Sequence, residues 1–166
     1  MKLKIEYVSI DELKPYAGNA KLHPAEQIDQ IIKSIEQFGM NDPIAVWKDN
    51  EIIEGHGRLI ALKEMGEERL KELGIDRIPI VRLDELTDNQ RKAYALVHNK
   101  LTMNSGWEYS LLDMEIESIE SIVMRDYGFD LTNIDLDGID DIFTDTETEK
   151  KKKTVTCPCC GKEVEI

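Results

Sequence analysis

The sequence has 166 residues, of which 21 are basic and 34 acidic, and its formal net charge at pH 7 is −13. This length allows one domain with a core plus an appendage, and the acidic balance argues against tight nucleic-acid binding by the isolated chain, because such affinity depends on Lys and Arg. No apolar run approaches the roughly 18 residues of a membrane span. There is no secretion signal, and the cysteines form no disulfide framework, so we expect a cytoplasmic protein without a membrane segment.

The first third of the chain predicts a strand and then a helix. Residues 3–8 alternate apolar with polar side chains, which is typical of a strand. Residues 14–24 form a loop rich in Pro, Gly and Asn. A helix is expected over residues 25–38, with Gly39 as its stop. One face of this helix consists of Ile28, Ile31, Ile32, Ile35 and Phe38.

The middle of the chain predicts a hairpin followed by helices. Residues 44–48 (IAVWK) and 52–54 (IIE) are short apolar runs on either side of a turn, so we expect them to pair as strands. A helix follows over residues 57–65 and Gly66 closes it. A second short helix then ends at Gly74.

One strand and two helices complete the predicted elements. The run IPIVRL (78–83) predicts a strand, and Thr87 and Gln90 are spaced as a capping box for a helix from 88 to about 100. Residues 107–125 predict an amphipathic helix. Its apolar positions are Leu112, Ile116, Ile119 and Val123. The order of elements predicts an α+β fold.

Charge divides the chain unevenly. Residues 1–104 carry 15 basic and 18 acidic residues, residues 105–149 carry 1 and 14, and residues 150–166 carry 5 and 2. The acidic part is interpreted as a solvated helix face and loop, or as a nucleic-acid mimic or docking surface for a basic partner. The predicted division is a domain over 1–104, an acidic helical extension over 105–145, a linker over 146–153 and a tail over 154–166.

The stretch IIEGHGRLIAL (52–62) runs from a strand to a helix through two glycines. Glycine lets the backbone take φ > 0 and approach another group closely. The first turn of a helix exposes N–H donors that favour anions, and Arg58 adds a fork-shaped counter-charge. These features indicate a phosphate-bearing ligand, although the Gly-x-Gly-x pattern also occurs in plain turns.

The order of elements, together with SIEQFGMNDPIAV (34–46), EGHGRLIAL (54–62) and VHNKL (97–101), resembles the N-terminal domain of the ParB family. That domain shares a superfamily with sulfiredoxin. The resemblance covers about residues 3–104 and is nearest to the ParB-like nuclease domains of phages and other mobile elements, which stand alone or precede DNA methyltransferase domains. It implies a small domain in which helices pack on a mixed sheet. The chain itself carries no methyltransferase motif.

The resemblance implies that a nucleoside triphosphate with Mg²⁺ binds at the strand-to-helix junction. Gly55, Gly57 and Arg58 would hold its phosphates. His56 would be the catalytic group, because it stands where relatives keep their reactive residue, and imidazole can act as a base near neutral pH. The relatives have glutamate or cysteine there. Histidine at this position therefore argues against ParB-type triphosphate hydrolysis and sulfiredoxin-type repair.

A second box and a loop are also implied to contact the nucleotide. ParB proteins carry Glu-Asn-x-x-Arg at the end of the following helix, where this chain has His98, Asn99 and Lys100. The asparagine matches but the glutamate and the arginine are missing, and Asn99 is equally well placed to cap a helix end. The implied loop consists of Asn41, Asp42 and Pro43. An Asp-Pro pair is equally typical of a turn before a strand.

Other chemically distinctive residues are interpreted as structural. His23 precedes Pro24 at the start of a helix, which favours a local structural role. Trp47 and Trp107 are interpreted as packing residues, because no basic residues alternate with aromatic ones as in a single-strand binding track.

The tail predicts an incomplete zinc site. Cys157 and Cys160 fit the Cys-Pro-x-Cys-Gly knuckle of zinc ribbons, and Cys159 adds a third thiol. A structural Zn²⁺ needs four ligands, and no second knuckle follows. The site is therefore incomplete, shared across a homodimer, or the remnant of a lost ribbon.

Three functions remain open at this point. The first is a nucleotide-binding ParB-like module in DNA modification, maintenance or partition of a phage or mobile element, acting on DNA directly or through a partner such as a methyltransferase. The second is a nuclease or nucleotide-dependent phosphotransferase, and the third is a degenerate scaffold that binds a partner through the acidic segment. The Gly-His-Gly-Arg box favours the first function over the third. The missing glutamate and arginine favour the third over the second.

Overall fold

The structure, a computed structural model, describes residues 3–129 and two short strands near the C-terminus. The chain divides into two compact units, Met1–Phe129 and Asp130–Ile166. In the second unit, β5 (Thr154–Thr156) pairs antiparallel with β6 (Glu163–Glu165). The predicted zinc ligands Cys157, Cys159 and Cys160 and residues 130–145 of the acidic extension lie outside the described residues. The four-part division of the chain and the zinc knuckle therefore stay predictions.

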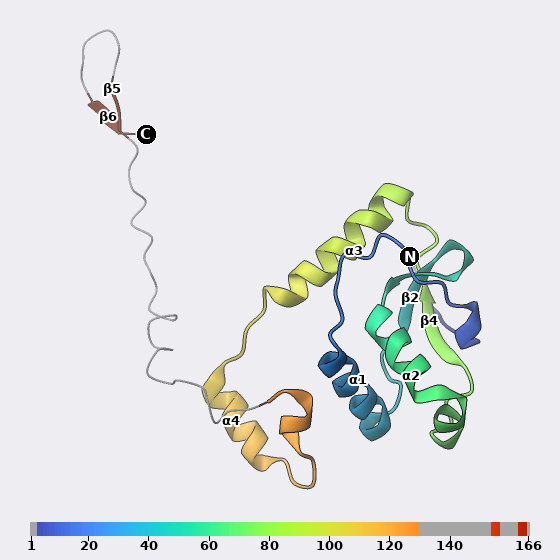
Figure 1. Cartoon of the computed structure of the whole chain (residues 1–166). Helices are drawn as coiled ribbons and strands as arrows, with labels where there is room; N and C mark the ends of the chain where they lie inside the picture. Colours follow the sequence, from blue (N-terminus) through green and yellow to red (C-terminus); the bar gives the residue numbers. More distant parts are fainter. Residues whose placement is uncertain (1–2, 130–153, 157–162, 166) are drawn as a thin grey trace. The chain divides into compact units, whose positions relative to one another are not determined.

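A four-stranded mixed sheet forms the centre of the first unit (Figure 1). Its strands are β1 (Ile5–Val8), β2 (Ile44–Trp47), β3 (Glu51–Glu54) and β4 (Ile78–Arg82). Their order is β1-β4-β2-β3, and β2 and β4 are parallel whereas the other neighbours are antiparallel. Parallel neighbours need a crossover connection, which β3 and a helix provide here. The predicted α+β fold with a mixed sheet and a β2–β3 hairpin is confirmed.

Four helices accompany the sheet. They are α1 (Ala25–Phe38), α2 (His56–Glu72), α3 (Asp88–Met103) and α4 (Tyr109–Ser118), with the 3₁₀ turns η1 (Ile10–Glu12), η2 (Lys48–Asn50) and η3 (Met124–Tyr127). Gly66, at φ 74°, interrupts α2, so this element comprises the two helices expected there. The capping box starts α3: the Gln90 amide donates to the Thr87 hydroxyl, and the Gln90 side chain accepts from the Thr87 amide. Within the described residues, no helix has both the length and the apolar character to cross a membrane.

Helices cover both faces of the central strands. Ile44 and Ile52 belong to a core cluster shared with α1 and α2, which lie side by side against the sheet in Figure 1. Ala45 and Ile53 face the opposite way and pack with Tyr94 of α3. Strands buried on both faces are apolar throughout rather than alternating, which explains the continuous IAV and II runs. The junction between β3 and α2 therefore lies next to both layers of helix.

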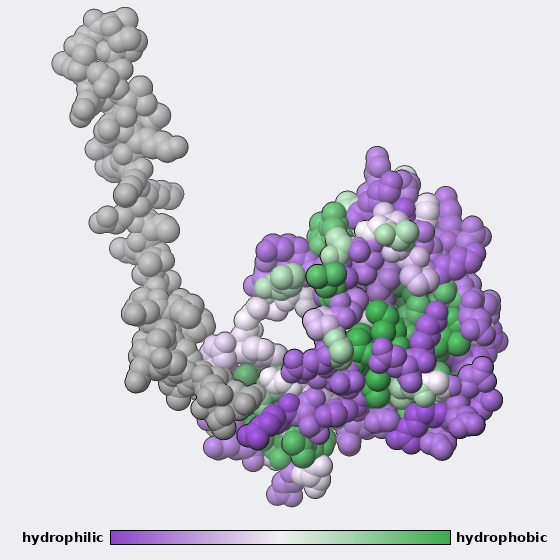
Figure 2. Space-filling model, in the orientation of Figure 1, coloured by the Kyte–Doolittle hydropathy of each residue, from purple (hydrophilic) through white to green (hydrophobic). Residues whose placement is uncertain are grey.

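The edge strand β1 is less covered. Its residues Ile5 and Tyr7 are 58% and 57% exposed, whereas Val8 is 6% exposed. The cluster under α3 draws on β2, β3 and β4 but on no residue of β1, so one face of this strand stays open. On the face seen in Figure 2, hydrophilic residues predominate and apolar residues gather in separate groups.

The helix expected over residues 107–125 is shorter than predicted. It ends at Ser118, and Ser121 has a positive φ of 66°, so Ile119 and Val123 lie outside it. Two contacts explain the break, because η3 turns back onto α1. Lys33 pairs with Asp126 at 2.9 Å, and the rings of Phe38 and Tyr127 lie 5.8 Å apart.

Candidate functional site

The two glycines of the strand-to-helix junction serve different purposes. Gly55 is the N-cap of α2 at φ 99° and ψ 21°, a left-handed conformation that L-residues seldom adopt. Gly57 has ordinary helical geometry, but a Cβ at this position would lie 2.9 Å from Nδ1 of His23. One glycine therefore makes the turn, and the other lets the loop before α1 approach the helix backbone.

A cavity of about 180 Å³ opens at this junction. Its walls come from three parts of the chain: residues 54–58, the loop residues Asn19, Lys21 and His23, and His98, Asn99 and Thr102 of α3, with Ile31 and Ile53. All three histidines of the chain line it. The unpaired N–H groups in the first turn of a helix carry partial positive charge, so the start of α2 favours an anion here.

His56 is held as a neutral acceptor. It is 9% exposed, and its Nε2 accepts a hydrogen bond of 3.2 Å from the backbone N–H of Tyr16. Burial, and then the neighbouring charge of His23, lower the pKa of His56. An imidazole that accepts at Nε2 carries its proton on Nδ1. His56 therefore ties the loop at residue 16 to the first turn of α2.

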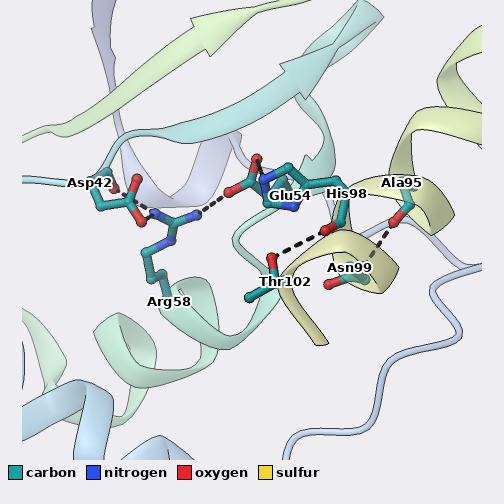
Figure 3. Close-up of polar contacts among 7 residues, drawn as sticks. All are labelled: Asp42, Glu54, Arg58, Ala95, His98, Asn99 and Thr102. Carbon is teal, nitrogen blue, oxygen red and sulfur yellow. Dashed lines mark hydrogen bonds and ion pairs between the residues drawn. The ribbon is translucent and has the colours of Figure 1, made fainter. Parts of the chain in front are cut away.

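Arg58 lies in the first turn of α2 (Figure 3). Its side chain is only 13% exposed. Its Nη1 donates to the carbonyl oxygen of Asp42 at 3.1 Å and also contacts the Asp42 carboxylate. Its Nη2 donates to Oε1 of Glu54 at 2.9 Å. Burial lowers the pKa of Arg58, but guanidinium stays protonated in proteins. Arg58, which the sequence predicts to bind phosphate, is thus already paired with two carboxylates.

The second predicted box lies on α3. His98 Nε2 is 3.3 Å from Oε2 of Glu54, and His98 Nδ1 is buried without a hydrogen-bond partner among the described residues. Asn99 donates from Nδ2 to the carbonyl of Ala95 at 2.8 Å, inside the helix. The alternative that Asn99 caps a helix end is wrong, because α3 continues to Met103 and Asn104 is its C-cap.

The structure brings most of the predicted site residues together. Gly55, His56, Gly57, Arg58, His98 and Asn99 line the cavity. Lys100, Asn41, Asp42 and Pro43 are not among the lining residues, and Asp42 connects to the site only through Arg58. Whether the lining residues bind a nucleotide stays a prediction.

Sequence reasoning missed the loop wall and the contacts that two charged residues make. His23 does have the local contact expected of it, at 3.0 Å from Gln27 Oε1, yet it also lines the cavity beside Lys21. Glu54 joins Arg58 to His98. No local pattern marks these residues, because their importance comes from segments that meet only in the folded chain.

Arg91 is the second missed charge and fixes the start of α3. It is 5% exposed and pairs with Glu51 at 2.8 Å and with Asp88 at 2.7 Å. Its guanidinium carbon lies 4.3 Å from the ring centre of Tyr16 and 4.8 Å from that of Trp47. These cation–π contacts hold α3 against the β2–β3 hairpin and the loop at residue 16.

The residues that the structure describes contain no group of three His, Cys, Asp or Glu side chains placed to hold a metal ion. Phosphate groups, in contrast, fit the donors present: backbone N–H groups, Lys21, side-chain amides and imidazoles. Apart from the carboxylate of Glu54, the cavity is therefore lined by groups of the kinds that bind anions.

No protein-family model matches the chain. In sequence it is 44% identical over 91 residues to the ParB-like nuclease domain-containing protein YnaK of Escherichia coli (strain K12), and the match covers 55% of this chain and 95% of that protein. In structure it is similar to the C-terminally truncated chromosome-partitioning protein ParB from Caulobacter crescentus, complexed with CTP-γ-S. That likeness has a TM-score of 0.53 and 16% identity, and covers 75% of this chain and 71% of that chain. A Pnob8-like ParB-N domain gives a TM-score of 0.41 with 22% identity, over 57% of this chain and 35% of that chain.

The structural likeness shows a fold of the ParB N-domain type, as the sequence resemblance implied. The sequence match is more specific, because it extends over nearly the whole of the E. coli protein. The chain belongs to the family of ParB-like nuclease domain proteins.

Proposed function

We propose that the chain is a nucleotide-binding ParB-like module that holds the phosphate groups of its ligand at the start of α2. The observation that carries this proposal is the cavity at the β3–α2 junction. There a left-handed glycine, the N–H groups in the first turn of α2 and a lysine converge with three imidazoles. The Caulobacter ParB of similar fold was obtained with CTP-γ-S, which supports a nucleoside triphosphate as the ligand. Mg²⁺ is proposed as the counter-ion of its phosphates.

Lys21 is proposed as the principal side-chain charge for the phosphates. It lines the cavity and forms no ion pair within residues 3–129. Arg58, in contrast, is paired with the carboxylates of Asp42 and Glu54, so its role here is to fix the junction. His56 would donate through its Nδ1–H, because its Nε2 is taken by Tyr16.

The size of the cavity limits what it encloses. Its volume of about 180 Å³ is below the roughly 300–1,000 Å³ of pockets that bury a whole ligand. We infer that the cavity receives the phosphates and that the nucleoside projects outward.

The cellular role that we propose is DNA modification, maintenance or partition in a phage or other mobile element. The family membership and the chromosome-partitioning function of the Caulobacter protein support a role on DNA. The acidic net charge favours action on DNA through a partner rather than directly, and we propose a methyltransferase as such a partner. A homodimer and a cytoplasmic location are parts of the same proposal. Nuclease activity is the second candidate, favoured by the name of the E. coli relative.

Calorimetric titration of the full chain with each nucleoside triphosphate and Mg²⁺ tests the proposal. We expect binding by the wild type and an affinity about tenfold lower for Lys21→Ala, because a charge-assisted contact contributes about 1.5–3 kcal/mol. Lys63→Ala is the matched control, since Lys63 is exposed on α2 and does not line the cavity. No binding at millimolar nucleotide would reject the proposal and favour a scaffold role.

A further inference from the structure

Glu54 links two walls of the cavity through separate oxygen atoms. Its Oε1 accepts from Arg58 Nη2 at 2.9 Å, and its Oε2 lies 3.3 Å from His98 Nε2. Arg58 belongs to the first turn of α2 and His98 to the second half of α3. Figure 3 shows the carboxylate of Glu54 between these two side chains. Its side chain is 23% exposed, so the contacts are partly shielded from water.

The second half of α3 has few other attachments. Its N-terminal half is held by Arg91 and by the packing of Tyr94 and Ala95 on the sheet. Over residues 96–103, the contact of His98 Nε2 with Glu54 Oε2 at 3.3 Å is the one polar side-chain contact with another helix or strand within residues 3–129. This half nevertheless provides the α3 wall of the cavity.

We propose that Glu54 is a positioning residue that holds the α3 wall against the first turn of α2 and thereby sets the spacing of the phosphate cavity. This inference rests on the proposed phosphate binding for its functional consequence. Its structural part, the tie between β3 and α3, stands on the contacts alone. In the sequence, Glu54 is a candidate carboxylate for the metal ion of a nuclease, and the family comparison assigns it no positioning role.

The alternative to a positioning role is that Glu54 is only a negative charge near the cavity. The two roles can be distinguished by the affinity of a variant that lacks this charge. A carboxylate beside an anion site repels the anion, so removing a mere bystander charge would raise phosphate affinity. Removing a positioning residue would lower the affinity, because the α3 wall would no longer be held in place. The two roles therefore predict opposite changes in phosphate affinity for the same variant.

The first test uses inorganic tripolyphosphate as the probe, titrated calorimetrically into the full chain. We expect Glu54→Ala to weaken binding about tenfold. Glu36→Ala is the matched control, since Glu36 pairs with Arg69 at 2.8 Å and does not line the cavity, and it should bind like the wild type. Unchanged or tighter binding by Glu54→Ala would overturn the inference.

Variants of His98 provide a test that a general loss of structure would not mimic. His98→Gln keeps an N–H donor for Glu54 and should retain affinity within about twofold, whereas His98→Ala should weaken it about tenfold. In a Glu54→Ala background the two His98 variants should bind equally. A difference of the same size in that background would show that His98 acts independently of Glu54, which overturns the tie between them.

Amide hydrogen exchange tests, without any ligand, whether Glu54 holds the second half of α3 in place. Residues 96–103 should exchange faster in Glu54→Ala than in Glu36→Ala or the wild type. Equal exchange would reject the positioning role and leave the phosphate proposal standing. Failure of the wild type to bind tripolyphosphate would reject the phosphate proposal, and the exchange experiment would still decide whether Glu54 holds α3.

Discussion

Residues at the β3–α2 junction form ion pairs and hydrogen bonds, most of which could not be predicted from the sequence. Arg58 contacts Asp42 and Glu54, Glu54 also contacts His98, and His56 accepts from the backbone of Tyr16. Glu54 and Arg58 are four residues apart, whereas the other three pairs join segments that are far apart in the chain. The residues predicted to bind phosphate therefore also stabilise the fold. Their substitution should lower both the stability of the protein and its affinity for phosphate.

Arg58→Ala should lower the free energy of unfolding by about 1–3 kcal/mol, because Glu54 would keep its charge in a partly buried position without its partner. Arg69→Ala is the control. Arg69 also contacts two carboxylates, Glu36 and Glu72, but its side chain is 47% exposed. Exposed ion pairs contribute little, so this variant should unfold like the wild type. Urea denaturation measures both, and equal stability of the two variants would contradict the structural role of Arg58.

His56 should make stability sensitive to acid. Burial and the charge of His23 lower its pKa from the ordinary value of 6.5, so below pH 6.5 the unfolded chain binds a proton that the native protein excludes. This contribution is complete above pH 6.5 and is lost as the pH falls below it. His56→Gln keeps an acceptor for the Tyr16 amide but does not titrate. Thermal unfolding between about pH 7.5 and about pH 5.5 should show a smaller loss of stability for the variant; parallel profiles would contradict this.

At the scale of elements, most boundaries follow from local signals. The helix α1 with its Gly39 stop, the break at Gly66 and the capping box of α3 all lie where propensity and turn chemistry place them. The early end of α4 does not, because it depends on the packing of η3 against α1. The loop wall with Lys21 and His23 could not be predicted for the same reason: it is defined by a close approach to Gly57 in space.

The turn between β3 and α2 can be tested with a pair of glycines. Gly55 and Gly128 have similar backbone geometry, at φ 99°, ψ 21° and φ 87°, ψ 9°. A Cβ at Gly55 would lie 3.1 Å from the buried Ile44, whereas at Gly128 it would meet the flexible side chain of Gln30. Gly128→Ala should cost about 1 kcal/mol of unfolding free energy and Gly55→Ala about 2–3 kcal/mol. An equal loss of unfolding free energy in the two variants would show that the core beside Gly55 accommodates a Cβ without strain.

At the scale of the whole molecule, the family domain occupies only part of the chain. The E. coli relative matches 55% of it, and the acidic extension and cysteine-containing tail were interpreted from composition and spacing alone. Those signals predict chemistry, such as thiolate ligands, but they do not specify which segments meet. The fold of the first unit was predictable because its signals are dense and local, whereas the arrangement of the cavity walls needed coordinates.

Measurements of zinc content and of mass in solution should show whether the C-terminal tail binds zinc. A single chain offers the thiols of Cys157, Cys159 and Cys160, and structural zinc takes four ligands. If the knuckle binds zinc, a second copy should complete the site, so added zinc should raise the mass in solution. Replacing Cys157 and Cys160 by serine should abolish that effect. Substoichiometric zinc and an unchanged monomer would remove metal from the function.

The stacking of Arg91 on Trp47 gives the protein an intrinsic optical reporter. The indole of Trp47 also donates from Nε1 to the carbonyl of Leu86 at 3.0 Å, so its surroundings depend directly on how the start of α3 meets the sheet. The second tryptophan, Trp107, is 56% exposed and would contribute the emission of a hydrated indole. In a Trp107→Phe variant the fluorescence would come from Trp47 alone. Its wavelength and quenching would then follow the attachment of α3 in real time, during titration or unfolding, without an added label.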